Sequence, residues 1–244
     1  MPGAVEVAGR DLADDALFRP VRSGNAFEDT VGRLLQAIRL GIVSPGEALP
    51  AERDLAVRLA VSRDTVREAI RSLAESGFLV ARRGRYGGTF VTDPLPPRGD
   101  LDGAAPGAAE LDDVLVVREI LETGAARGAA SRTLAAADRD RLWTRLGETS
   151  AADVADYRRL DSRWHLTIAE LAGAPSLVPL VADNRTRVND LLDRIPLLEP
   201  NIAHSNAQHE AIAIAVLSGD ADRAAAAMRE HLDGSAALLR GFLG

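Results

Sequence analysis

Three histidines and one aspartate in the C-terminal half of the chain have types and spacing that suit metal binding. Asp161 and His165 are four residues apart, so on a helix they share one face and can approach a single ion. His209 lies ten residues before Gly219 and His231 twelve residues after it, so at about 1.5 Å per residue the two stand at similar heights on adjacent helices. Three imidazoles and a carboxylate favour a divalent ion such as Zn²⁺, Ni²⁺ or Mn²⁺, with room for a further ligand.

Each of these residues also has an alternative interpretation. A single histidine on a helix, such as His231, is more often a surface or capping residue than a ligand. Asp161 can instead form an ion pair with Arg158 or Arg163, and Trp164 beside His165 can simply indicate core packing. The four residues together favour the metal site, and we expect His204 to lie outside it.

A second group of residues suits nucleic-acid binding. Arg63, Arg67 and Arg71 recur at i, i+4 and i+8, which places them on one face of a helix. An arginine fork can bind guanine bidentately or hold a phosphate. The alternative is a solvated helix face, in which Asp64 and Glu68 pair with arginines three or four residues away.

Two further arginines lie in a glycine-rich segment downstream. Arg83 and Arg85 alternate with Gly84 between two short β-type runs, residues 78–82 and 88–92. At the tip of such a hairpin, a backbone without side chains can approach a sugar-phosphate chain closely. This pattern therefore predicts a wing that contacts DNA.

The elements that must position these arginines form a winged helix-turn-helix over residues 26–93. A first helix carries an apolar stripe that ends at Gly41, and a short second helix carries Arg53, which can contact phosphate. A three-residue turn then leads to a third helix, for which Ser62 is the expected N-cap. Three helices followed by a β-hairpin complete the domain.

The metal-binding candidates lie in a separate, helical domain. Residues 94–108 contain four prolines and three glycines, a composition that predicts a linker. From residue 109 to 244 the apolar residues keep a helical period, so we expect an all-helical antiparallel bundle. Its candidate helices lie near residues 110–133, 137–148, 151–172, 176–194, 203–217 and 220–242.

Composition and charge agree with this division. The net charge is −7, but residues 26–93 hold ten Arg and nine acidic residues, while residues 94–244 hold sixteen Arg and twenty-three acidic residues. The absence of cysteine excludes disulfides, zinc fingers and thiol catalysis. No apolar run suits a membrane span or a signal peptide, so we expect a cytoplasmic protein with no membrane partner. Residues 1–25 lack sustained periodicity and are expected to form a mobile arm.

The run from Leu49 to Leu79, together with the segment from Arg83 to Val91, closely resembles the winged-helix domain of the GntR transcription regulators. The resemblance implies a homodimer that binds a short palindromic operator in double-stranded DNA. The family's DNA-contacting positions fall on Arg53, Ser62, Arg63, Thr65, Arg67 and Gly84.

Residues 110–240 resemble the FCD effector domain of the FadR subgroup of these regulators. In its metal-containing members an Asp-x-x-x-His pair and two later histidines bind a divalent ion, which receives a small carboxylate effector. Asp161, His165 and the two later histidines match all four positions. The resemblance also implies that Arg118 and Asn189 face the effector, with Arg118 as counter-charge.

The leading interpretation is a transcription regulator, expected to be a repressor, whose operator affinity changes when a metal-bound carboxylate occupies the C-terminal domain. The effector need supply only about 1–3 kcal/mol of differential affinity between two states. One alternative is a DNA-tethered metal-dependent hydrolase, but the four ligands consume the obvious acid–base groups, so we do not expect an enzyme. Another is a regulator with a purely structural metal.

Overall fold

The chain folds into two compact, mainly helical units. The computed structural model describes residues 17–20, 26–84, 87–96, 107–197 and 199–243. The first unit takes in the described residues up to 96, apart from 39–41. The second takes in residues 39–41 and the described residues from 107 onward.

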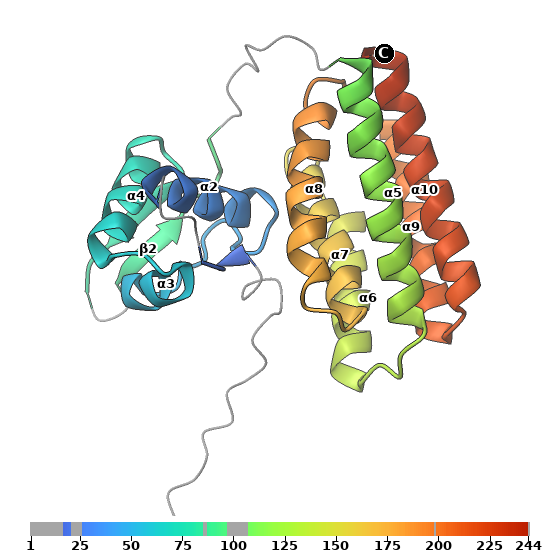
Figure 1. The fold of residues 1–244 in the computed structure, drawn as a ribbon, viewed down its shortest axis with the longest axis horizontal. Helices are drawn as coiled ribbons and strands as arrows, with labels where there is room; N and C mark the ends of the chain where they lie inside the picture. Colours follow the sequence, from blue (N-terminus) through green and yellow to red (C-terminus); the bar gives the residue numbers. More distant parts are fainter. Residues whose placement is uncertain (1–16, 21–25, 85–86, 97–106, 198, 244) are drawn as a thin grey trace, which may run out of the picture. The chain divides into compact units, whose positions relative to one another are not determined.

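The first unit has the predicted winged helix-turn-helix architecture (Figure 1). Strand β1 pairs with β2 in antiparallel register, with Leu79 opposite Val91. Its elements in chain order are α2 (Ala26–Arg39), α3 (Glu52–Leu59), α4 (Arg63–Glu75), β1 (Leu79–Arg82) and β2 (Gly88–Val91).

The tight turn between α3 and α4 orients helix α4. Helix α3 ends at Ala60, whose φ of 55° is left-handed and whose N–H donates to the carbonyls of Ala56 and Val57. As predicted, Ser62 caps α4, because its Oγ accepts a hydrogen bond of 3.0 Å from the backbone N–H of Thr65. The hydroxyls of Ser62 and Thr65 also lie 2.8 Å apart.

A single apolar core holds the first unit together, and it reaches into the expected N-terminal arm. Phe18 is 2% exposed and belongs to this core, so the expectation of a mobile arm fails at this residue. Residues 1–16 and 21–25 lie outside the described part of the chain. All five elements contribute to this core, with residues that include Leu34, Ile38, Leu55, Leu59, Val66, Ile70, Leu79 and Val91.

The second unit is an all-helical bundle, as predicted (Figure 1). Helix α5 contacts α7, α8, α9 and α10, and short turns connect successive helices. None of the helices in the described residues is long and apolar enough to cross a membrane. The helices are α5 (Ala108–Ala130), α6 (Ala136–Ser150), α7 (Tyr157–Leu171), α8 (Leu177–Leu192), α9 (Glu199–Ser218) and α10 (Ala221–Leu243).

Helix α7 lies at the centre of this bundle but begins later than predicted. The period suggested a start at residue 151, whereas the Asp153 carboxylate accepts the backbone N–H of Asp156 at 2.9 Å in a turn that precedes the helix. Every residue from Asp161 to Leu171 is buried. Polar side chains on α7 therefore face the interior and must find partners there.

Candidate functional site

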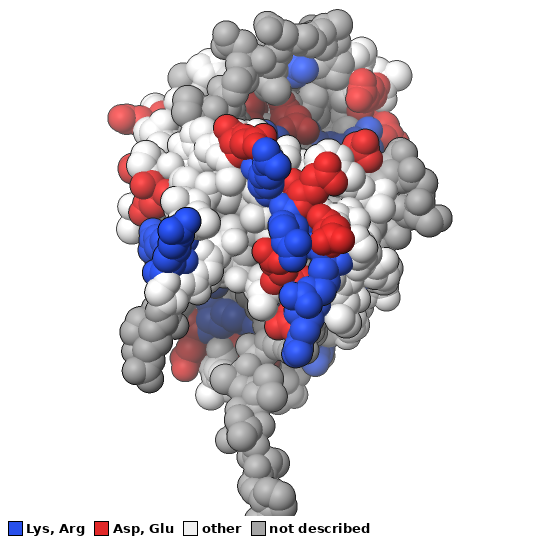
Figure 2. All heavy atoms as spheres, turned by 90° about the vertical axis from the view of Figure 1, so that its left-hand side faces the viewer, with Lys and Arg blue, Asp and Glu red and all other residues white. Residues whose placement is uncertain are grey.

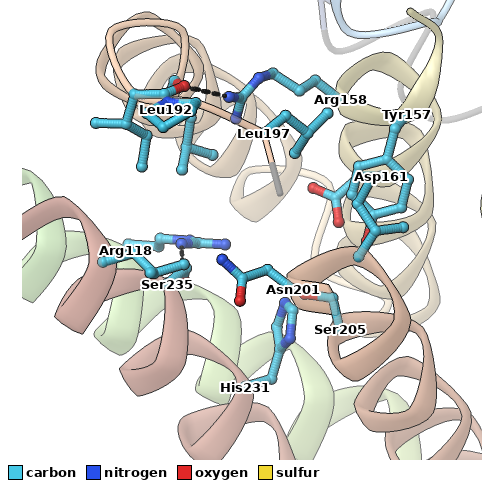
Figure 3. A pocket seen from close by; sticks show the side chains of 14 residues that line it. Arg118, Tyr157, Arg158, Asp161, Leu192, Leu197, Asn201, Ser205, His231 and Ser235 are labelled. Atoms are coloured by element: carbon cyan, nitrogen blue, oxygen red, sulfur yellow. Dashed lines mark hydrogen bonds between the residues drawn. The ribbon is translucent and has the colours of Figure 1, made fainter. Parts of the chain in front are cut away.

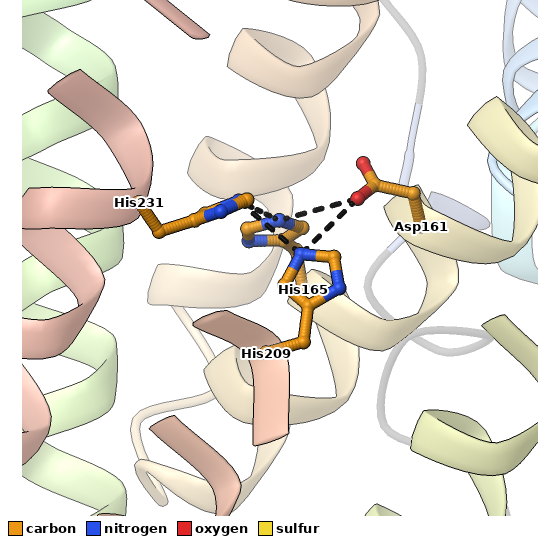
Figure 4. Close-up of side chains that lie close together, drawn as sticks. All are labelled: Asp161, His165, His209 and His231. Carbon is orange, nitrogen blue, oxygen red and sulfur yellow. Dashed lines mark hydrogen bonds and ion pairs between the residues drawn. The ribbon is translucent and has the colours of Figure 1, made fainter. Parts of the chain in front are cut away.

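The four predicted metal ligands converge inside the second unit (Figure 4). Asp161 and His165 come from α7, His209 from α9 and His231 from α10, and one ligand atom of each lies within 4.8 Å of the others. Nε2 of His231 is 3.2 Å from Nε2 of His209 and 3.3 Å from Nε2 of His165. Oδ1 of Asp161 is 3.4 Å from Nε2 of His209. His204 is exposed and outside this cluster.

The donor atoms of this cluster fit a divalent cation. Four ligands bonded at about 2.0–2.1 Å to a tetrahedral ion stand about 3.3 Å apart, close to the spacing found here. Nδ1 of His165 contacts the Glu122 carboxylate, and Nδ1 of His231 lies 3.2 Å from Oε1 of Gln208. These acceptors place the imidazole proton on Nδ1 and a lone pair on Nε2. Lone pairs facing one another repel, so the cluster suits a cation.

Burial sets the charge of the three imidazoles. Desolvation lowers the pKa of His209 to about 3 and holds the pKa values of His165 and His231 below their ordinary range. The rings are therefore neutral at pH 7, which is the form that binds metal. Burial acts to raise the pKa of Asp161, but Arg185, His165, His209 and Arg118 together outweigh it and hold this pKa well below its ordinary range.

Sequence reasoning missed two buried charged residues beside the cluster. Glu122 on α5 contacts His165 and accepts a hydrogen bond of 3.1 Å from Nε of Arg118. Burial opposes its ionisation, but His165, Arg118 and Arg185 together hold the pKa of Glu122 well below its ordinary range. Arg185 on α8 forms an ion pair with Asp161. The cluster thus contains two carboxylates and two guanidiniums among neutral imidazoles.

A signal for both missed residues does exist in the sequence. Arg118 and Glu122 continue the buried stripe of α5 that runs through Val114 and Ala125, spaced three or four residues apart. Arg185 likewise stands between Val181 and Val188 on the buried stripe of α8. A charged residue within an apolar stripe must be paired, which marks it as a candidate site residue.

A small cavity that is partly open to solvent adjoins the cluster (Figure 3). Asp161 and His231 line it together with Arg118, whose Nη1 donates to Oγ of Ser235 at 2.7 Å. Burial lowers the pKa of Arg118, although Glu122 opposes this effect, and a guanidinium remains charged at neutral pH. The structure therefore brings the predicted counter-charge Arg118 next to the predicted ligands.

Tyr157 lines this cavity, whereas Asn189 does not. Tyr157 lines it, and burial followed by the charge of Asp161 raises the pKa of its phenol, so the hydroxyl stays protonated. Asn189, predicted to face the effector, is not a lining residue. It is 3% exposed, and its Nδ2 donates to Oγ of Ser162 at 2.8 Å.

On the first unit, the arginines of α4 face solvent. Arg63 is exposed and Thr65 half-buried near the start of the helix. Arg67, whose side chain is 59% exposed, lies 3.2 Å from Asp64 and 3.5 Å from Glu52. Such exposed ion pairs contribute only about 0–1 kcal/mol, so phosphate or a base can replace the acidic partners.

Basic and acidic side chains share this surface. Figure 2 shows a band of basic side chains with acidic ones alongside. Arg71 continues the α4 stripe and pairs with Glu75 at 2.9 Å, while Arg53 on α3 has a 79% exposed side chain. Acidic residues therefore pair with arginines of α4, as in the alternative of a solvated helix face, but these arginines remain exposed to solvent.

The wing is only partly described. Gly84 has a φ of 110°, which a residue with a Cβ rarely adopts, and its carbonyl accepts the N–H of Gly87 at 2.9 Å. Arg83 is exposed beside this turn. Arg85, the other predicted wing contact, lies outside the described residues.

Two family models match the chain, one for each unit. Residues 27–91 match "Bacterial regulatory proteins, gntR family", and residues 113–234 match the FCD domain. The first match covers the helix-turn-helix and wing, and the second covers the helices that carry the four clustered residues.

Named relatives are transcription regulators. The chain is 31% identical over 226 residues to the "Putative L-lactate dehydrogenase operon regulatory protein" of Escherichia coli, covering 87% of this chain and 84% of the relative. It is 28% identical to the "HTH-type transcriptional repressor NanR" of Enterobacter sp., covering 98% and 93%. The solved structure of E. coli McbR/YncC has a similar fold, with a TM-score of 0.53 at 20% identity, covering 88% of this chain and 97% of the other.

Proposed function

The chain belongs to the GntR family of DNA-binding transcription regulators and carries an FCD domain, and from this premise we propose that it is a metal-dependent sensor of the FadR subgroup. Its affinity for operator DNA would change when a small carboxylate binds at a divalent metal ion in the second unit. A regulator of chromosomal operators acts in the cytoplasm, so we propose a cytoplasmic location for this protein. The name of relatives such as the "HTH-type transcriptional repressor NanR" supports a role as a repressor.

One observation carries this proposal: four potential ligands converge, and two of them, Asp161 and His231, line a cavity that is also lined by the guanidinium of Arg118. Asp161, His165, His209 and His231 would hold a Zn²⁺, Ni²⁺ or Mn²⁺ ion, which when bound supplies Lewis-acid attraction for a carboxylate. Arg118 supplies a second positive charge for the same carboxylate. Glu122 and Gln208 orient the imidazoles of His165 and His231.

The two alternatives have less support. A hydrolase needs a general base whose pKa lies near neutrality. Glu122 and Asp161 are both held strongly acidic by buried arginines, so neither suits that role. A purely structural ion would not require a cavity at its ligands, whereas Asp161 and His231 both line one.

DNA recognition would involve α4 and the wing in each half of a homodimer. A two-fold dimer matches a palindromic operator, with one α4 in each major groove. Arg63 and Arg67 near the helix start would reach base edges, while Arg53 and Arg83 would contact the phosphate backbone.

Replacing Arg118 tests the effector role. We expect Arg118→Ala protein to keep its metal ion and bind operator, but to lose the carboxylate response, which in the wild type changes operator affinity by about 5–150-fold. Arg118→Met, which retains more of the buried stem, separates loss of charge from loss of packing. Arg187→Ala, which removes an exposed guanidinium on α8, is the control. An unaltered response in both Arg118 variants would rule out this residue as the counter-charge.

Replacing Arg83 tests the wing. We expect Arg83→Ala to weaken operator binding with little change in sequence preference, because a backbone contact carries no base information. Binding measured over a salt series should show the slope of log affinity against log salt concentration reduced by about one for the lost phosphate contact. A changed base preference with an unchanged slope would instead mean that the wing reads bases.

A further inference from the structure

The cavity beside the metal ligands has two chemically different sides (Figure 3). Arg118, Asp161 and His231 form its polar end, and Figure 3 shows Leu192 and Leu197 across the cavity from Arg118 and His231. The five apolar side chains of the lining, here called the apolar wall, are Leu192, Ile195, Leu197, Ile202 and Leu238. A ligand that fills the cavity must therefore have a polar group for the polar end and an apolar part for the apolar wall.

The two arginines that line the cavity have different neighbours. Arg158 on α7 is held by the C-terminal end of α8: its Nη2 donates to the carbonyls of Leu192 and Ile195, and its Nε lies 3.1 Å from Asp193. Arg118 also has partners, Glu122 and Ser235, but it lies at the polar end next to His231, one of the potential metal ligands. The cavity thus offers one anion-binding end.

The apolar wall penalises a second charged group. A carboxylate packed against these apolar side chains would lose its hydration, and Arg158, the second guanidinium of the lining, is already engaged by the end of α8, so this placement is unfavourable. An alkyl or aryl group in the same place would gain by leaving water, since each buried CH₂ contributes roughly a fourfold gain in affinity.

We propose that the effector is a monocarboxylate with an apolar body, such as a medium-length alkanoate or an arylalkanoate. Its carboxylate lies at the polar end with Arg118, and its body packs on the apolar wall. This inference rests on the proposed function and narrows the effector class, because it excludes dicarboxylates and acids as small as acetate as preferred ligands.

Three probes of matched chemistry test the inference on the full-length, metal-reconstituted protein. Acetate, hexanoate and adipate are titrated by calorimetry; hexanoate and adipate have six carbons each and differ by the second carboxylate. We expect hexanoate to bind at least about tenfold more tightly than acetate, as burial of several CH₂ groups requires. Hexanoate should also bind at least about tenfold more tightly than adipate.

A pair of leucine variants locates the effect. Leu197 is half-buried on the apolar wall, so we expect Leu197→Ser to reduce the advantage of hexanoate over acetate several-fold. Leu180 on α8 is 51% exposed and does not line the cavity, so Leu180→Ser should leave that advantage unchanged. Equal loss in both variants would contradict the placement of the ligand.

The possible failures are distinguishable. If adipate or acetate binds as tightly as hexanoate, the inference is overturned while a carboxylate sensor remains. If none of the three acids binds metal-loaded protein, both the inference and the proposed carboxylate effector are wrong.

Discussion

Substitution of His209 by alanine is expected to lower metal affinity at least about 100-fold while leaving operator binding intact. Loss of a residue that only orients a ligand typically costs 10–100-fold in affinity, so loss of a ligand should cost at least the upper value. Nε2 of His209 stands 3.2 Å from that of His231 and 3.4 Å from Oδ1 of Asp161, at the centre of the donor set. The helices proposed to read DNA belong to the other unit, so we expect them to be unaffected by this substitution.

Elemental analysis after reconstitution and dialysis measures this loss directly. Wild-type protein and His204→Ala should retain about one ion per chain, because His204 is exposed and outside the cluster. The rings of Trp164 and His209 are 4.2 Å apart, so His209→Ala leaves a space beside the indole. His231→Gln serves as a second variant with a smaller change in volume. Wild-type metal content in both ligand variants would show that the ion binds elsewhere.

Substitution of Arg67 by alanine should weaken operator binding by about 1–3 kcal/mol, or roughly 5–150-fold, through loss of a bidentate base contact. The fold should be unaffected, because this side chain is 59% exposed and its partners Asp64 and Glu52 form only surface ion pairs with it.

Fluorescence anisotropy with an operator duplex, together with circular dichroism, checks this expectation. Arg187→Ala removes an equally charged, exposed side chain from the second unit and controls for the change in net charge. If Arg67→Ala binds as the wild type does and has a native spectrum, α4 is not the recognition helix.

The sequence predicted most of the fold because its signals are local. The helical period located all six described helices of the second unit, and the Ser62 cap and the Gly-rich hairpin marked the ends of α4 and of the strands. The late start of α7 was missed, because it depends on the competing side-chain contact of Asp153 with the backbone of Asp156.

The site was predictable only where spacing along the chain fixes distance in space. Asp161 and His165 share a helix face, and His209 and His231 face each other across one turn, so their convergence followed from helix geometry. The partners of this set come from helices distant in sequence: Glu122 from α5 reaches His165, and Arg185 from α8 reaches Asp161. The tertiary packing of these helices decides such contacts.

The same limit applies to the cavity. Arg118 and Asn189 were placed at the effector by resemblance, yet only Arg118 lines the cavity, while Asn189 points to Ser162. The apolar wall joins the loop after α8 to α9 and α10, and no periodic pattern along the chain reveals that combination.

The most direct test of the account is the affinity of metal-loaded protein for an operator selected in vitro from random duplexes, measured with and without the tightest-binding carboxylate. We expect the carboxylate to change this affinity by about 5–150-fold, and the change to disappear after the metal is removed by chelation. An operator affinity that is the same with and without carboxylate, in protein shown to contain one ion per chain, would contradict a metal-dependent carboxylate sensor.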